Sequence, residues 1–188
     1  MVQNEIITLY HGSYCEVAAP DLSRCSRYKD FGQGFYLTTS KEQAMRFSLT
    51  SLKKAAAKGV VSEKQKYGVV SVFSSCTDKL SRLDVCRFKK ADEEWLGCVT
   101  GHRKGSIYAD DVKQYEKFDI ITGKVANDAT NATITAYMAG LYGDVGSERA
   151  KELCISLLLP ERLKDQYCFR TQRALDILDF TESFRVWK

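Results

Sequence analysis

The stretch Asp30-Phe31-Gly32-Gln33-Gly34-Phe35-Tyr36-Leu37-Thr38 decides the fold prediction, because it joins a tight turn to a short strand and a helix start. Two glycines stand among three aromatic residues within this stretch, which predicts backbone packed closely against flat rings. Gly34–Thr38 is expected to form the strand. Taken alone, the pattern also fits a purely structural strand with buried aromatics and a glycine bulge.

A helix is predicted directly after this strand. Thr39 or Ser40 provides the cap, and Thr39 with Glu42 has the spacing of a capping box. The apolar face is expected to carry Ala44, Phe47 and Leu52. A protein kinase is excluded despite the letters Asp-Phe-Gly, since the chain has no His-Arg-Asp catalytic loop and no full glycine-rich loop before a lysine strand.

Two further short motifs combine polar groups with strand-like sequence. Tyr10-His11-Gly12-Ser13 ends a first strand, so it can present an imidazole and accessible backbone to a ligand. Asp165-Gln166-Tyr167-Cys168-Phe169 alternates, which places Gln166 and Cys168 on one face of a late strand. Each motif alone also fits a structural histidine or a solvent-facing glutamine.

The rest of the chain mixes strands and helices without regular βαβ alternation. Expected strands are Ile6–Tyr10, Gly34–Thr38, Tyr67–Ser75, Leu83–Phe88, Phe118–Ala126, Gln166–Arg170 and Phe180–Trp187. Expected helices run from Thr39 or Ser40 to near Gly59 and over Asp92–Arg103, Ile134–Tyr142, Glu148–Leu158 and Thr171–Leu178. This order predicts an α+β fold with a largely antiparallel sheet, in one domain spanning residues 1–188.

Composition excludes several classes of protein. The 188 residues carry a net charge of +4, which does not by itself indicate nucleic-acid binding. No stretch approaches about 18 apolar residues, so no transmembrane helix is expected, and Met1–Glu5 lack a basic signal-peptide start. Seven cysteines without a Cys-x-x-Cys pair fit buried thiols in a reducing compartment, so a cytoplasmic location without a metal site is expected.

In their order along the chain, the three motifs resemble the ADP-ribosyltransferase superfamily. The similarity is to the branch with a His-Tyr-Glu motif that includes diphtheria toxin and the poly-ADP-ribose polymerases, and more narrowly to the bacterial DUF3990 family. It extends over residues 6–180, including Glu94-Trp95-Leu96, the segment Phe118–Asp128 and the segment Gln166–Leu175. The resemblance implies a split, largely antiparallel sheet with flanking helices.

The resemblance also implies a reaction, in which the nicotinamide–ribose bond of NAD is cleaved and ADP-ribose is transferred. By motif match, His11 would hydrogen-bond the adenosine-side ribose, Gly12 would hold the nicotinamide amide through its backbone, and Tyr36 would stack on the nicotinamide ring. The remaining expected cofactor contacts are Ser13, Gly34, Phe47 and Asn127, of which Phe47 fits equally well as a core residue.

Gln166 departs from the glutamate usual in this branch. A glutamine can orient a ribose hydroxyl, but it lacks the charge that stabilises a developing cation and cannot act as a general base. A carboxylate from elsewhere is therefore expected, with Asp128 the first candidate and Asp30 and Asp119 behind it. Asn127 and Asp128 fit a helix cap equally well. Arg103 is either an exposed side chain or a partner of the NAD pyrophosphate.

The sequence thus predicts a mono-ADP-ribosyltransferase with a protein or nucleic-acid acceptor. As implied by the family, it would act as a toxin of a toxin–antitoxin pair or as an anti-phage effector, with a small antitoxin or immunity protein as partner and no role at a membrane. The alternative is a binding module that keeps an NAD- or nucleotide-sized site without transfer.

Residues 41–66 carry a local charge of +5, which indicates either a solvated helix or a basic border of the site.

Overall fold

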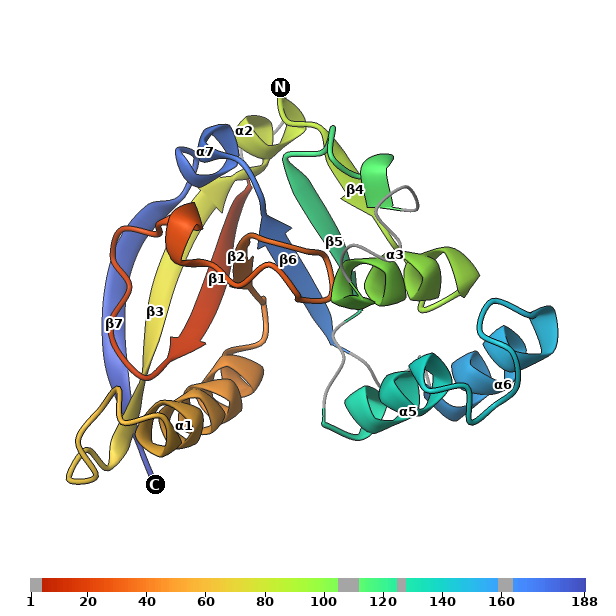
Figure 1. The fold of residues 1–188 in the computed structure, drawn as a ribbon. Helices are drawn as coiled ribbons and strands as arrows, with labels where there is room; N and C mark the ends of the chain where they lie inside the picture. The colour runs from red at the N-terminus through yellow and green to blue at the C-terminus, as the bar shows by residue number, and fades with distance from the viewer. Residues whose placement is uncertain (1–4, 105–111, 125–127, 159–163) are drawn as a thin grey trace.

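The computed structural model describes residues 5–104, 112–124, 128–158 and 164–188, with residues 128 and 129 given by their backbone alone. Its strands form two sheets that lean together (Figure 1). The fold is α+β with mostly antiparallel strand pairs, as the sequence predicts.

The first sheet has the strand order β1-β3-β7 and is antiparallel throughout. It consists of β1 (Ile6–Ser13), β3 (Tyr67–Cys76) and β7 (Asp179–Trp187). The central strand β3 is almost entirely buried, which its run of small and β-branched residues permits. The edge strand β7 is largely exposed on its outer side.

The second sheet has the order β2-β6-β5-β4. Its strands are β2 (Phe35–Leu37), β6 (Asp165–Phe169), β5 (Ile120–Lys124) and β4 (Val85–Arg87). The edge strand β4 runs parallel to β5, and the other pairs are antiparallel.

One bridge between Tyr10 and Thr38 joins the two sheets. Both backbone bonds of the pair form, with N–O distances of 2.8 Å from Tyr10 N and 3.0 Å from Thr38 N. Beyond this bridge β1 and β2 separate, because β1 continues along β3 and β2 pairs with β6. The sheet is therefore split at the two strands that carry the first two motifs.

Three buried clusters hold these layers together. One lies between the sheets and includes Leu9, Phe35, Phe73 and Phe169. A second covers the far face of the four-stranded sheet, where Trp95 of α3 (Glu93–Lys104) and Ile134 of α5 (Asp128–Met138) pack with α6 (Glu148–Leu158). A third joins the three-stranded sheet to α1 (Lys41–Ala57).

The start and face of α1 are predicted in part. Ser40, one of the two predicted caps, is confirmed, since its side chain accepts from Gln43 N. The predicted capping box of Thr39 and Glu42 is wrong, because Glu42 pairs with Arg46. The buried face of α1 is Ala44, Ser48, Leu52 and Ala55, while Phe47 is 48 % exposed.

The other differences lie at short helices and helix ends. The sequence analysis missed the 3-10 helix η1 (Leu22–Arg24) and the short helix α2 (Thr77–Ser81). The helix α5 begins at Asp128 rather than at Ile134, and α7 (Gln172–Leu175) is shorter than expected. Among the described residues, no helix is both long and apolar enough to span a bilayer.

Gly12 fixes how closely α1 approaches the first sheet. A Cβ atom at this position would lie 2.1 Å from the Ala44 carbonyl oxygen and 2.9 Å from Ser48 N, both backbone atoms of α1. Neither atom can move without shifting the helix, so the close contact requires glycine.

We expect Gly12→Ala to lower the free energy of unfolding by about 1–3 kcal/mol, because α1 must move away from β1. Gly97→Ala is the matched control, since nothing lies within 4 Å of a Cβ there and alanine favours the helix by about 0.5–1 kcal/mol. Urea denaturation measures both. Equal stability of the two variants would contradict the close contact.

Candidate functional site

The three sequence motifs come together on consecutive strands. His11 lies on β1, Tyr36 on β2 and Gln166 on β6. The bridge between Tyr10 and Thr38 joins β1 to β2, and Tyr36 pairs with Cys168 across β2 and β6. Because side chains alternate along a strand, Tyr36, Cys168 and Gln166 project from the same face of the four-stranded sheet.

His11 fills the point at which the two sheets separate. Its Nδ1 lies 2.8 Å from the Tyr36 carbonyl oxygen, so Nδ1 carries the proton and donates it. Its ring also contacts the Phe35 ring, with 4.4 Å between centroids. Burial lowers the pKa of His11, outweighing the backbone hydrogen bond that raises it, so the ring is neutral at pH 7. No described residue bonds to Nε2, which is left as an acceptor.

Tyr36 is bound to the turn that precedes it. Its hydroxyl donates to the Gly32 carbonyl at 2.8 Å and accepts from Phe31 N at 2.9 Å. Burial raises the pKa of Tyr36 well above its usual range, so the hydroxyl remains protonated and keeps both bonds. The hydroxyl thus holds the turn, and Tyr36 as a whole is partly buried.

Gln166 is 6 % exposed and is held by a carboxylate. Its Nε2 donates to Asp30 Oδ2 at 3.0 Å and to the Lys124 carbonyl at 3.4 Å. Phe31 reaches this position because β5 has Gly123 opposite Gln166, and a Cβ on Gly123 would lie 2.9 Å from the Phe31 ring. Seating Phe31 over Gly123 brings the neighbouring Asp30 onto Gln166.

Arg103 completes this arrangement from α3 and is neither an exposed side chain nor free for a pyrophosphate. Its Nε and Nη2 reach Asp30 Oδ1 at 2.9 Å and 2.6 Å, and its Nη1 donates to Asn131 Oδ1 at 2.8 Å. The Asp30 and Arg103 side chains are 13 % and 15 % exposed. The ion pair is therefore largely desolvated and joins the turn to α3 and α5.

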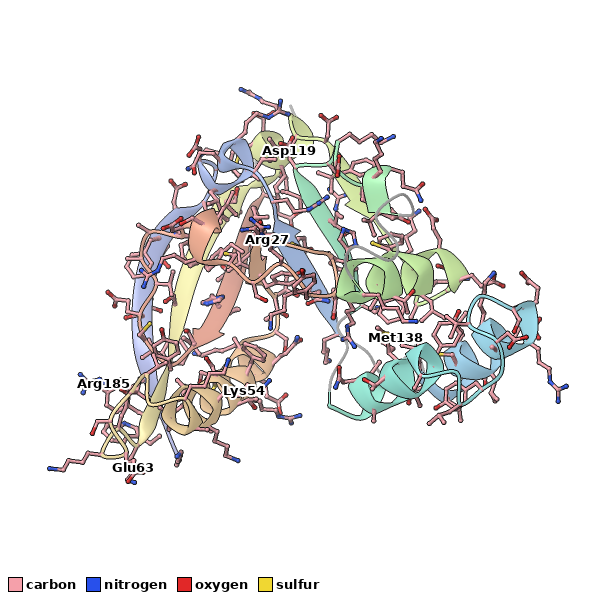
Figure 2. The ribbon with its side chains drawn as sticks, in the orientation of Figure 1. Arg27, Lys54, Glu63, Asp119, Met138 and Arg185 are labelled. Carbon is pink, nitrogen blue, oxygen red and sulfur yellow. The ribbon has the colours of Figure 1, made fainter. Side chains whose placement is uncertain are left out.

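The part of the basic segment that carries Lys54 and Lys58 lies near this turn. Burial lowers the pKa of Lys29, and the nearby ammonium groups of Lys54 and Lys58 and the Arg103 guanidinium lower it further, while Asp30 raises it. Figure 2 shows Lys54 on α1. Cations of α1, the turn and α3 thus lie within electrostatic reach of one another.

The glycines among the predicted site residues serve packing in the structure. Gly12 faces α1, and a Cβ at Gly34 would lie 2.4 Å from Cys168 Sγ. Ser13 is buried at the end of β1. Phe47 is on the surface of α1, so its alternative assignment to the core is wrong. Asn127 lies outside the described residues, as does the side chain of Asp128, whose backbone begins α5.

Asp119, another predicted carboxylate, is occupied by structural bonds. Its carboxylate accepts from Thr171 Oγ1 at 2.6 Å and from Asp84 N at 3.0 Å, and it pairs with Arg173. It directly precedes β5 and lies at the top of the view in Figure 2, whereas Lys54 of α1 lies near the bottom.

A reactive cysteine is not formed by the one cysteine–histidine contact among the described residues. Cys98 Sγ lies 3.5 Å from His102 Nδ1, but that nitrogen also bonds to the Cys98 carbonyl at 2.8 Å. Burial raises the pKa of the Cys98 thiol and lowers that of His102, so the pair stays uncharged and offers no thiolate. In the part of the chain that the structure describes, no group of three or more potential metal ligands gathers.

Two cavities lie beside the motif segments, since Gln33 lines one and Tyr167 lines the other. One of 340 Å³ is lined by Leu22, Gln33, Phe118 and Arg170 among others, and one of 180 Å³ lies between α2 and β4, β5 and β6. Neither is lined by His11, Tyr36 or Gln166.

No sequence pattern indicated that Asp30 and Arg103 form a pair beside Gln166. Asp30 and Gln166 are 136 residues apart, and the contact depends on where Phe31 packs. The available signal was the position of Asp30 in the stretch that also holds Tyr36. No local feature marked Arg103 as its partner, because that contact depends on the placement of α3.

The chain matches the model of one protein family. The family is described as "Protein of unknown function (DUF3990)", and the match covers residues 7–180. No curated protein matches the chain.

Arg103→Met should destabilise the protein by about 3–5 kcal/mol, because it leaves the Asp30 carboxylate buried without its cation. Adding Asp30→Asn should recover part of this loss. Arg46→Met, which breaks an exposed pair with Glu42, is the control and should change stability by less than about 1 kcal/mol. Urea unfolding measures the stability of each variant. Equal losses of stability in Arg103→Met and Arg46→Met would contradict a desolvated Asp30–Arg103 pair.

Proposed function

The chain belongs to the DUF3990 family, and we propose that it is an NAD-dependent mono-ADP-ribosyltransferase. In this reaction the bond between nicotinamide and ribose breaks, nicotinamide leaves with the electron pair, and an acceptor nucleophile attacks the ribose carbon and loses a proton. The transition state resembles an oxocarbenium ion, as in glycoside hydrolysis. The residues proposed to carry it are His11, Tyr36 and Gln166.

The observation that carries the proposal is a pair of fixed hydrogen-bond acceptors on β1 and β6, the two strands on either side of β2. His11 donates through Nδ1 to the protein, which leaves Nε2 as an acceptor. Gln166 donates through Nε2 to Asp30 and Lys124, which leaves Oε1 as an acceptor. A ligand with several hydroxyl groups suits such a site, and NAD carries two ribose rings.

Tyr36 adds an aromatic surface between these acceptors. Its hydroxyl is anchored to Gly32 and Phe31, so its ring has a fixed position at the strand between β1 and β6. A positively charged nicotinamide ring gains about 1–2 kcal/mol from stacking on a tyrosine when water is excluded. This attraction weakens when the leaving nicotinamide becomes neutral, which favours its release.

A second candidate function is NAD or nucleotide binding without transfer. The observation in its favour is charge: Gln166 is neutral, and Arg103 compensates the nearby Asp30 carboxylate. A site without net negative charge stabilises an oxocarbenium ion less than a free carboxylate does. Release of nicotinamide separates the two functions, because a pure binding module retains NAD intact.

The test is nicotinamide release together with mass spectrometry of modified macromolecules after incubation of a bacterial extract with NAD. Wild type should release nicotinamide and leave an ADP-ribose adduct on a protein or nucleic acid. His11→Ala and Tyr36→Ala should reduce both at least tenfold, since each loses a contact to NAD. Tyr28→Ala, at an exposed tyrosine, is the matched control and should behave as wild type.

The same variants test the proposed role as a toxin or anti-phage effector. Expression of wild type in a bacterial host should arrest growth, and Tyr36→Ala should not. Equal adduct levels in wild type, His11→Ala and Tyr36→Ala would contradict the assignment of this site. Binding of NAD by wild type without nicotinamide release would favour the binding module.

The basic border of the site should attract the pyrophosphate of NAD. Lys29, Lys54 and Lys58 replaced together by Gln should weaken NAD binding and flatten its dependence on salt concentration, because the local positive field is lost. Replacement of Lys64, Lys66 and Lys188, which lie at the far end of β3 and β7, is the charge-matched control. Titration calorimetry at several salt concentrations measures this, and identical slopes in the two triple variants would contradict it.

A further inference from the structure

We infer that Asp30 is a positioning residue: it binds the Gln166 amide nitrogen, so that Gln166 offers a ligand only its acceptor oxygen Oε1. We also infer that this pairing is the reason glutamine occupies position 166. The claim that Oε1 serves a substrate hydroxyl rests on the proposed function. The coupling between the two side chains stands on geometry alone.

The amide of Gln166 has only one chemically consistent orientation. Its nitrogen faces two acceptors, Asp30 Oδ2 at 3.0 Å and the Lys124 carbonyl at 3.4 Å. Turning the amide over would place Oε1 against both of these oxygens, with no proton between them. Both amide hydrogens are therefore committed to the protein, and no described residue donates to Oε1.

Asp30 is itself held in place, and each of its two carboxylate oxygens accepts hydrogen bonds from a different side chain. Oδ1 accepts from both Nε and Nη2 of Arg103, and Oδ2 accepts from Gln166. Arg103 is held in turn by Asn131 of α5. The orientation of the Gln166 amide thus depends on a chain of bonds through the turn, α3 and α5.

A glutamate at position 166 does not fit this chain. Its carboxylate would lie within hydrogen-bond distance of the Asp30 carboxylate, at a site that is 6 % exposed. Two carboxylates so close cannot both be ionised, so one takes up a proton. The other charged or titratable groups nearby are Lys29, Lys54 and Lys58, His102 and Arg103 of α3, and the Lys124–Asp165 ion pair.

The stability test uses four variants: Gln166→Glu, Asp30→Asn, the double variant Asp30→Asn/Gln166→Glu, and the control Gln172→Glu. The control makes the same change beside a carboxylate, since Gln172 Nε2 donates to Asp176 Oδ1 at 2.8 Å, but this pair is exposed. Thermal unfolding is followed from pH 8 to pH 5 for each variant and for wild type.

We expect Gln166→Glu to unfold roughly 4–12 °C below wild type at pH 8. The difference in unfolding temperature between Gln166→Glu and wild type should decrease toward pH 5. The reason is that the carboxyl group introduced at position 166 has a higher pKa in the folded state than in the unfolded state. The folded state then binds more protons in this range, so its stability falls as pH rises. The double variant moves the single carboxylate from position 30 to position 166. Its stability loss at pH 8 should therefore be smaller than the sum of the losses in the two single variants. Three results would each overturn the inference: a Gln166→Glu unfolding temperature that stays equally far below wild type at every pH, stability losses of the two single variants that simply add in the double variant, or an equal loss in Gln172→Glu.

Nicotinamide release by the same proteins tests the second part of the inference, that Gln166 Oε1 accepts from a substrate hydroxyl. Asp30→Asn should lower kcat at least tenfold, because the Gln166 amide can then turn over. The double variant should regain much of the rate, with a new acid limb in its pH profile from the carboxylate at position 166. An unchanged rate in Asp30→Asn would overturn the positioning role. Should wild type release no nicotinamide, the proposed transferase activity fails, while the unfolding curves still decide the Asp30–Gln166 coupling.

Discussion

The buried carboxylate of Asp30 is the constraint on which the candidate site depends. It lies between Arg103, which neutralises it, and Gln166, which it orients. A buried charge is tolerated only when paired and hydrogen-bonded, so a shift of α3 that breaks the Asp30–Arg103 ion pair is costly. The same ion pair therefore fixes the position of α3 against the turn and the direction in which Gln166 presents its oxygen.

Three glycines allow the close contacts that bring the motifs to this point. Gly12 lets α1 lie against β1, Gly34 makes room for Cys168, and Gly123 makes room for Phe31. Phe31 then carries Asp30 onto Gln166, while the Tyr36 hydroxyl closes the turn by bonding to Phe31 N and Gly32 O. Close packing and site geometry thus have a common cause, and these glycines allow close contacts within the protein.

The α+β class could be predicted from the sequence, since predicted strands and helices follow one another without regular βαβ alternation. The split of the sheet was expected only from the family resemblance. The apolar face of α1 was predicted incorrectly at Phe47, because helix rotation is set by the contact at Gly12. Asp30 was ranked below Asp128, because the sequence shows no sign that a turn near residue 30 packs against a strand near residue 166. Arg103 was misread for the same reason: whether an arginine is exposed or paired depends on tertiary contacts.

The central claim is that His11 Nε2 and Gln166 Oε1 receive hydroxyl groups of NAD beside the Tyr36 ring. A crystal structure with a non-cleavable NAD analogue tests it most directly. The account predicts a ribose hydroxyl within hydrogen-bond distance of Gln166 Oε1, the nicotinamide against Tyr36, and Gln166 Nε2 still bonded to Asp30. An analogue bound in the cavity beside Arg170, or a Gln166 amide turned away from Asp30 to donate to the ligand, would contradict it.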